Sequence, residues 1–460
     1  MPTNRMLSDL LDAIATRGRA FVERAGKSGA AHADGGVAEL LERLLSGRGE
    51  ASGLATAGVV LDHWRSAGPA AREAFLVLLG ERFGTDEARL NAAIEAYRHQ
   101  PTAENAAAIH HAAEPRRQEI IRRLNMVTGA MEVLLEMRAA TLTLMRKIPA
   151  LALVDADFVH LLSSWFNRGF LVLRPIDWST SASILERIIR YEAVHAIRSW
   201  EDLRLRLAPS DRRCFAFFHP RLPDEPLIFV EVALTRAIPV RIEEVLASDR
   251  AIIPAAEATT AVFYSISNTQ VGLRGVSFGN FLLKQVIETL GEELPNIDTF
   301  VTLSPVPGFA AWLAKEPPSP ATTTLMTLLA RPGWADDGEV AAEIEGPLVA
   351  EAARYLLRAK GGDGTALDPV ARFHLGNGAR LERINFLADR SPKGMQESWG
   401  VMVNYRYELS DIERNHELFT GAGTVVAARD VEKLLHVAGP GRSRAVRRVA
   451  HSTSSSGFHR

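Results

Sequence analysis

The chain has 460 residues, with 53 lysines and arginines against 55 aspartates and glutamates. This near-neutral balance argues against a general nucleic-acid-binding protein, which normally carries a strongly basic domain. The single cysteine, Cys214, excludes an intrachain disulfide and a cysteine-based zinc cluster. No apolar run approaches the ~18 residues that span a bilayer, and a chain of this length normally divides into two or more domains.

The first third of the chain is predicted to be helical. Apolar residues recur at helical spacing in five segments, and these are 37–45, 55–64, 72–83, 86–97 and a longer stretch that begins after Pro115. No motif that carries chemistry lies within this region, which is typical of a packing or oligomerisation module. We therefore expect an all-helical domain over residues 1–168.

The pattern changes near residue 169, where strand-like runs begin to alternate with helical stretches. The strand-like runs are rich in β-branched and aromatic residues, and they are 170–173, 227–234, 261–266, 298–303, 381–387 and 401–409. Helices are predicted over 179–196, 281–290 and most of 317–367. This alternation predicts a mixed α/β domain over 169–438. Residues 439–460 are rich in Ser, Gly and Arg, a composition typical of a disordered tail.

A glycine-rich loop connects the predicted strand 261–266 to the predicted helix 281–290. Gly272, Gly275 and Gly279 allow the backbone to turn tightly and to present N–H groups at a helix N-terminus, which is a site for phosphate. The spacing is neither Gly-x-Gly-x-x-Gly nor a Walker loop. It resembles the looser loop with which acetyltransferase-like folds hold the pyrophosphate of coenzyme A. The alternative is a plain glycine-rich turn.

Ser304 ends the predicted strand 298–303, where α/β folds often place reactive groups. Pro305 and Pro307 prevent a regular ladder or helix after it and hold the serine on a stiff bend. The surrounding residues do not form the Gly-x-Ser-x-Gly turn of hydrolases. A serine that caps a helix or a turn is the structural alternative.

Two further motifs carry a histidine and a tyrosine. His374 precedes a Gly-Asn-Gly turn and can act as an acid or a base near neutral pH, or it can simply bond a backbone carbonyl. In the strand 401–409, alternation places Tyr405 and Tyr407 on one face. A tyrosine there either hydrogen-bonds a substrate or packs as a half-buried side chain.

Taken together, these motifs resemble the malonyl-CoA decarboxylase family over residues 180 to 437. The blocks occur in family order, and they are Arg190–His195, Cys214–Leu234, Phe263–Ser267, Gly272–Lys284, Leu303–Phe309, Phe373–Gly378 and Asn404–Tyr407. The resemblance implies a helical oligomerisation domain followed by an acetyltransferase-like (GNAT-type) catalytic domain with a central mixed sheet. It also implies Ser304 and His374 as the catalytic pair, with Tyr407 beside them. The coenzyme A loop implied by the resemblance contains Arg274, Gly275, Val276, Ser277, Phe278, Gly279 and Asn280.

The activity that the resemblance implies is decarboxylation of malonyl-CoA to acetyl-CoA and CO2. The thioester itself accepts the electron pair as an enolate, so we expect neither a metal nor an organic cofactor, and coenzyme A is part of the substrate. We expect a homo-oligomer, a dimer or tetramer, with no nucleic-acid or membrane partner. The absence of a clear mitochondrial leader and of a C-terminal Ser-Lys-Leu leads us to expect a cytoplasmic location. Two rival functions are a coenzyme A-dependent acyltransferase and a non-catalytic acyl-CoA-binding protein.

Overall fold

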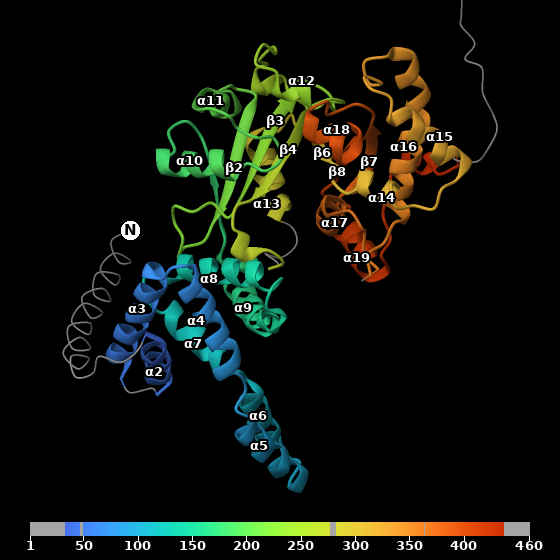
Figure 1. The fold of residues 1–460 in the computed structure, drawn as a ribbon. Coiled ribbons are helices and arrows are strands. Elements are labelled where there is room, and N and C mark those ends of the chain that lie inside the picture. The colour runs from blue at the N-terminus through green and yellow to red at the C-terminus, as the bar shows by residue number, and fades with distance from the viewer. Residues whose placement is uncertain (1–32, 47–48, 277–281, 363, 437–460) are drawn as a thin grey trace, which may run out of the picture. The chain divides into compact units, whose positions relative to one another are not determined.

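The computed structural model describes residues 33–46, 49–276, 282–362 and 364–436 (Figure 1). Contacts group the chain into two compact units, Met1–Pro239 with Val245–Val301 and Val240–Glu244 with Thr302–Arg460. The second unit begins inside the region 169–438, and the domain boundaries expected from the sequence stay a prediction. The predicted tail 439–460 lies outside the described residues.

The described part of the first unit, from residue 33 onward, begins with helices, as predicted. They are α2 (Ala33–Leu45), α3 (Glu50–Ser66), α4 (Pro69–Arg82), α5 (Glu87–His99), α6 (Ala103–Ala113), α7 (Arg116–Asn125), α8 (Ala130–Leu144) and α9 (Ala152–Trp165). The long helix that we predicted after Pro115 is wrong, because the chain breaks it into α7 and α8. Gly129 lies at the break with a φ of 71°, which is far from the helical value and easily adopted only by glycine.

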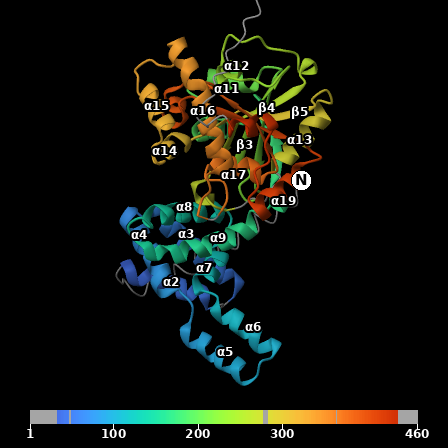
Figure 2. The same cartoon turned by 90° about the vertical axis from the view of Figure 1, so that its right-hand side faces the viewer.

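Two buried arginines join helices of this region to α9. Arg117 on α7 pairs with Asp157 at 2.5 Å, and Arg138 on α8 pairs with Asp155 at 2.9 Å. Helices α5 and α6 differ from the others because they pack on each other as a hairpin (Figures 1 and 2), and α5 has no buried residue.

A sheet follows the helices within the first unit. Strands β1 to β4 are neighbours in antiparallel order, and β5 follows β4. Their bounds are β1 (Val172–Pro175), β2 (Arg212–Phe218), β3 (Ile228–Thr235), β4 (Thr260–Asn268) and β5 (Thr299–Thr302). Strand β2 was not predicted as a separate element. It begins with two arginines and continues as an unbroken apolar run, which is a pattern that periodicity alone does not assign.

Helices α10 (Ala182–Tyr191) and α11 (Trp200–Leu207) bury their apolar side chains in one core with β2 and β3. Helix α10 ends at Tyr191, which is earlier than the helix predicted over 179–196. It ends because the Glu192 carboxylate accepts hydrogen bonds from the backbone N–H groups of Val194 and His195, which form a turn.

The remaining elements are η1 (Pro149–Leu151), η2 (Arg168–Phe170), α12 (Ile242–Leu246), η3 (Ala255–Glu257), η4 (Val271–Leu273) and α13 (Leu282–Glu293).

The second unit has a small antiparallel group of strands in which β8 (Met402–Tyr407) pairs with both β6 (Ser304–Pro305) and β7 (Arg380–Asn385). The predicted strands 381–387 and 401–409 are thus confirmed. The helices of this unit are α14 (Phe309–Leu313), α15 (Pro320–Leu329), α16 (Gly338–Arg358), α17 (Pro369–Gly376), α18 (Pro392–Ser398), α19 (Ile412–Ala422) and α20 (Arg429–Leu434). Within the described ranges, no helix combines the length and the apolar character needed to cross a membrane.

Candidate active site

Ser304 lies in the two-residue strand β6, directly opposite Val403 of β8. Only 5% of Ser304 is exposed. The position follows from the local sequence, since Pro305 has no N–H to donate and the regular pairing of this segment ends there. Ser304 is therefore held at a strand end, as predicted, but it is buried and does not cap a helix.

His374 lies in the last turn of α17, whose start and end are both fixed by the sequence. Asp368 caps the start by accepting from the N–H groups of Val370 and Ala371. The end needs Gly378, which has a φ of 82° and packs so closely against α19 that a Cβ would lie 2.2 Å from the Ile412 carbonyl oxygen. Asp368 and Gly378 thus determine where the helix starts and ends, and this determines the position of the His374 imidazole.

Ser304, His374 and Tyr407 meet in the second unit although they are far apart in sequence. Ser304 Oγ lies 3.1 Å from His374 Nε2, and His374 Nδ1 lies 2.9 Å from the Tyr407 hydroxyl. The imidazole also stacks on the ring of Tyr405, with 4.7 Å between ring centroids and 24° between the planes. The imidazole is therefore held at both nitrogens and across one face.

Burial shifts the pKa values of the two residues that contact each other at Nδ1, His374 and Tyr407. Burial alone lowers the pKa of His374 to about 3 and raises the pKa of Tyr407 well above its ordinary value. At neutral pH the histidine is a neutral imidazole and the tyrosine keeps its proton. A neutral imidazole carries one N–H and one acceptor nitrogen, so each of its two nitrogens has a different role toward Ser304 and Tyr407.

The sequence analysis missed Thr302 as a member of the cluster. Thr302 Oγ1 accepts a hydrogen bond from Ser304 Oγ at 2.9 Å and one from the Tyr405 N–H at 3.1 Å. Both threonine and serine point to the same side because they are two residues apart in extended chain. This spacing is the only signal that the sequence offered.

Asp368 is a second residue that the sequence analysis missed. Besides capping α17, its carboxylate accepts from the Tyr355 hydroxyl at 3.3 Å and from the backbone N–H of Gly308. It therefore ties the turn that follows Ser304 to the helix that carries His374. Asp followed by Pro at a predicted helix start is the sequence signal, because it indicates an N-cap.

The predicted coenzyme A loop belongs to the first unit. Arg274 and Gly275 are exposed and Val276 is buried, directly after η4. Gly275 has a φ of 76°, as the tight turn predicted from its glycines requires. Ser277, Phe278, Gly279 and Asn280 lie outside the described residues.

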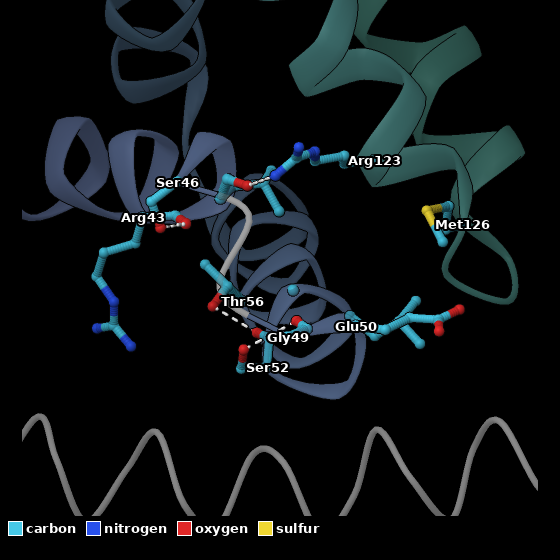
Figure 3. A pocket seen from close by; sticks show the side chains of 11 residues that line it. Arg43, Ser46, Gly49, Glu50, Ser52, Thr56, Arg123 and Met126 are labelled. Carbon is cyan, nitrogen blue, oxygen red and sulfur yellow. Dashed lines mark hydrogen bonds between the residues drawn. The ribbon is translucent and has the colours of Figure 1, made fainter.

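A recess of about 470 Å³ lies elsewhere in the first unit, between α2, α3 and α7 (Figure 3). Arg43, Ser52 and Arg123 are among its lining residues, and Arg123 donates to the backbone carbonyl of Leu44. None of the predicted site residues lines it. Over the ranges that the structure describes, no group of three or more His, Cys, Asp or Glu side chains could hold a metal ion.

Family models match both the helical region and the region that follows it. Residues 169–445 match the family model of the malonyl-CoA decarboxylase C-terminal domain, and residues 83–166 match that of the N-terminal domain. The crystal structure of malonyl-CoA decarboxylase from Rhodopseudomonas palustris is 56% identical, with a TM-score of 0.85, and the match covers 88% of this chain and 100% of that one. The crystal structure of malonyl-CoA decarboxylase from Agrobacterium vitis is 55% identical, with a TM-score of 0.83 and coverage of 86% and 99%.

A curated relative extends the comparison to an animal protein. The mitochondrial malonyl-CoA decarboxylase of Anser anser anser is 37% identical over 352 residues, which is 69% of each chain. The family resemblance found in the motifs is thus confirmed. From the two family models and the solved structures together, we conclude that this chain belongs to the malonyl-CoA decarboxylase family of carboxy-lyases.

Proposed function

We propose that the chain converts malonyl-CoA to acetyl-CoA and CO2, and that Ser304 and His374 act on the malonyl group. The observation that carries this assignment is the buried contact of 3.1 Å between Ser304 Oγ and His374 Nε2. A hydroxyl and a neutral imidazole side by side can orient a carboxylate and move a proton.

The reaction begins with loss of CO2 from the malonyl carboxylate. The bond between the carboxylate carbon and the methylene carbon breaks, and its electron pair moves into the thioester as an enolate. When the substrate binds, the Ser304 hydroxyl turns from Thr302 Oγ1 to the carboxylate, donates its one hydrogen bond there and holds the carboxylate out of the thioester plane. The enolate then takes one proton at carbon, which gives acetyl-CoA, so each turnover consumes one proton from the medium.

His374 supplies that proton. The imidazole is neutral in the free protein because burial lowers its pKa to about 3. A negative malonyl carboxylate beside it raises the pKa of the imidazole, so the proton enters with the substrate and leaves to the carbon. General acid catalysis of this kind contributes ~10²–10⁴-fold to a rate.

We propose that Tyr407 acts on the imidazole and not on the substrate. The Tyr407 hydroxyl contacts Nδ1, whereas Ser304 contacts Nε2. A tyrosine hydroxyl can donate to Nδ1 of the neutral ring and accept from Nδ1–H of the charged ring. Tyr407 is therefore proposed as a positioning residue that accommodates both states of His374.

The loop from Arg274 to Asn280 is proposed to bind the phosphates of coenzyme A. The described part of the loop supports this proposal, because Arg274 brings a cation and Gly275 brings an exposed turn of backbone. Backbone N–H groups before a helix N-terminus are suited to phosphate.

The test is purified protein with malonyl-CoA as the only substrate, followed by measurement of acetyl-CoA and CO2. We expect turnover without any acceptor. An acyltransferase would leave malonyl-CoA intact until an amine or alcohol is added, and a binding protein would leave it intact throughout. Ser304→Ala and His374→Asn should each lower kcat by ~10²–10⁴-fold with coenzyme A affinity retained. Wild-type rates in both variants would contradict the assignment.

We further propose that the helical region mediates a homo-oligomer. Within this region, we propose that the α5–α6 hairpin forms the contact between subunits. Helix α5 buries no residue in one chain, although Tyr97 on it is a large apolar side chain. The hairpin can be removed cleanly because the Arg116 N–H donates to the Gly84 carbonyl across its base. Replacing 86–113 with a two-residue link should lower the number of subunits per particle, which is the solution mass divided by the mass of the shortened chain. An unchanged number of subunits would contradict this role.

A further inference from the structure

The turn that leads into the predicted coenzyme A loop lies directly on helix α8 of the helical region. Gly272, in η4, is the closest point. A Cβ at this position would lie 2.3 Å from the Leu135 carbonyl oxygen, so backbone meets backbone and only glycine fits. The helical region and the loop are thus in contact within one unit.

Arg138 on α8 holds the turn at two places. Its Nη1 donates to the Gly272 carbonyl and its Nη2 to the Arg274 carbonyl, both at 2.7 Å. Its Nε donates to Asp155 on α9 at 2.9 Å, and only 2% of Arg138 is exposed. A guanidinium has a rigid fork of donors, so these three bonds fix the turn relative to two helices.

This fixation sets the direction of an N–H group in the loop. A trans peptide is planar, and its carbonyl and its N–H point to opposite sides. Because Arg138 holds the Arg274 carbonyl, the N–H of Gly275 in the same peptide points away from Arg138. Gly275 is exposed, and its N–H has no hydrogen-bond partner among the described residues. A ligand can therefore reach this N–H from solvent.

We infer that Arg138 is a positioning residue for coenzyme A, which it serves by holding the Gly275 N–H toward the pyrophosphate. The inference rests on the proposed function, since it takes Arg274 and Gly275, directly after η4, as part of the phosphate site. It gives the helical region a part in substrate binding that is separate from oligomerisation. Asp155 supports the same function by orienting the guanidinium.

Arg117 provides a matched comparison in the same helical region. It is also buried, and it also pairs with an aspartate of α9, Asp157. Its remaining bond goes to the backbone carbonyl of Leu153 and so stays among the helices. Loss of either arginine removes a buried ion pair, but only loss of Arg138 releases the loop.

The experiment compares Arg138→Met with Arg117→Met in the full chain. Three quantities are measured for each variant: the affinity for coenzyme A alone by calorimetry, KM and kcat for malonyl-CoA, and the thermal midpoint. We expect Arg138→Met to weaken coenzyme A binding and raise KM by roughly 10-fold to 100-fold, because small misplacement of binding groups has effects of that size. Its kcat should change by less than about threefold. Arg117→Met should lower the thermal midpoint with wild-type affinity and KM.

Arg138→Lys keeps the test decisive if the methionine variant does not fold. Lysine keeps the charge next to Asp155 but lacks the fork that reaches two carbonyls, so it should restore folding while KM stays raised. Wild-type affinity and KM in a folded Arg138→Lys or Arg138→Met protein would overturn the inference alone. A wild-type protein that neither binds coenzyme A nor consumes malonyl-CoA would overturn both the inference and the proposed function.

Discussion

The two units each bury a polar cluster, and the two clusters differ in charge. In the first unit Glu231, which is fully buried, accepts from Arg206 at 3.2 Å, and Arg206 also pairs with Asp202. In the second unit the buried chain from Thr302 through Ser304 and His374 to Tyr407 has only neutral side chains at neutral pH. One cluster is ionic and the other is not.

The difference shows how burial prepares a group for chemistry. Burial raises the pKa of Glu231 to about 8, although Arg206 beside it acts in the opposite direction. The negative charge of this carboxyl therefore depends on the guanidinium that faces it. A buried neutral imidazole has no counter-charge, so the arrival of an anionic substrate changes its proton affinity strongly. The ionic cluster is thus suited to hold the sheet of the first unit, and the neutral cluster is suited to transfer a proton.

Breaking the ionic cluster should have the largest effect on stability. Arg206→Met leaves Glu231 without its guanidinium, and removal of one partner of a buried pair costs about 3–5 kcal/mol. We expect this loss in the free energy of unfolding by urea, with kcat per folded molecule nearly unchanged. Arg204→Met, an exposed position on the same helix, is the control. A large fall in kcat at full folding would show that the ionic cluster also serves catalysis.

Two neighbouring tyrosines sharpen the comparison in the neutral cluster. Tyr407→Phe removes the hydroxyl that contacts His374 Nδ1, and loss of a buried hydrogen bond costs about 1–3 kcal/mol. The corresponding fall in kcat is about 5-fold to 160-fold. Tyr405→Phe is the control, since its ring stacks on His374 and its hydroxyl has no hydrogen-bond partner among the described residues. Equal kcat values for the two variants would refute a specific role for Tyr407.

The neutral histidine also predicts a dependence of stability on pH. The pKa of His374 is about 3 in the folded protein and close to 6.5 in the unfolded chain. The unfolded chain therefore binds the proton first, so stability is complete above about pH 6.5 and falls as the pH decreases from there toward 3. The slope reaches at most about 1.4 kcal/mol per pH unit.

Urea unfolding at pH 7, 6 and 5 measures this effect when wild type is compared with His374→Gln. As the pH falls, the free energy of unfolding should decrease more for wild type than for His374→Gln. His99→Gln, at an exposed position at the end of α5, should keep a constant difference. A constant difference for His374→Gln as well would mean that His374 is not buried in its neutral form.

The sequence predicted the helical region and most strands, and it named Ser304, His374 and Tyr407 as candidates, but it did not predict the contacts between these three residues. Periodicity located α3 and β8, yet it ran through Gly129, where one residue with positive φ divides a helix. The meeting of Ser304 with His374 depends on α17 and β6, which are brought together across 70 residues of sequence. Motif analysis named both residues without showing this contact.

Thr302 and Arg138 escaped prediction for a different reason. The role of each depends on hydrogen bonds that only the fold brings about. The two-residue spacing from Ser304 was the one signal for Thr302, and the sequence analysis found none for Arg138. Arg138 lies in an ordinary amphipathic helix, and its bonds to Gly272 and Arg274 join segments that are more than 130 residues apart. Only the folded structure reveals such long-range hydrogen bonds.

A double-mutant cycle on the Ser304–His374 pair tests the central claim most directly. The rate of CO2 release from saturating malonyl-CoA is measured for wild type, Ser304→Ala, His374→Asn and the double variant. Two groups that act as a unit have strongly non-additive effects, so we predict that the double variant is at most about tenfold slower than the slower single variant. A loss equal to the product of the two single losses, or a single variant with the wild-type rate, would contradict the account.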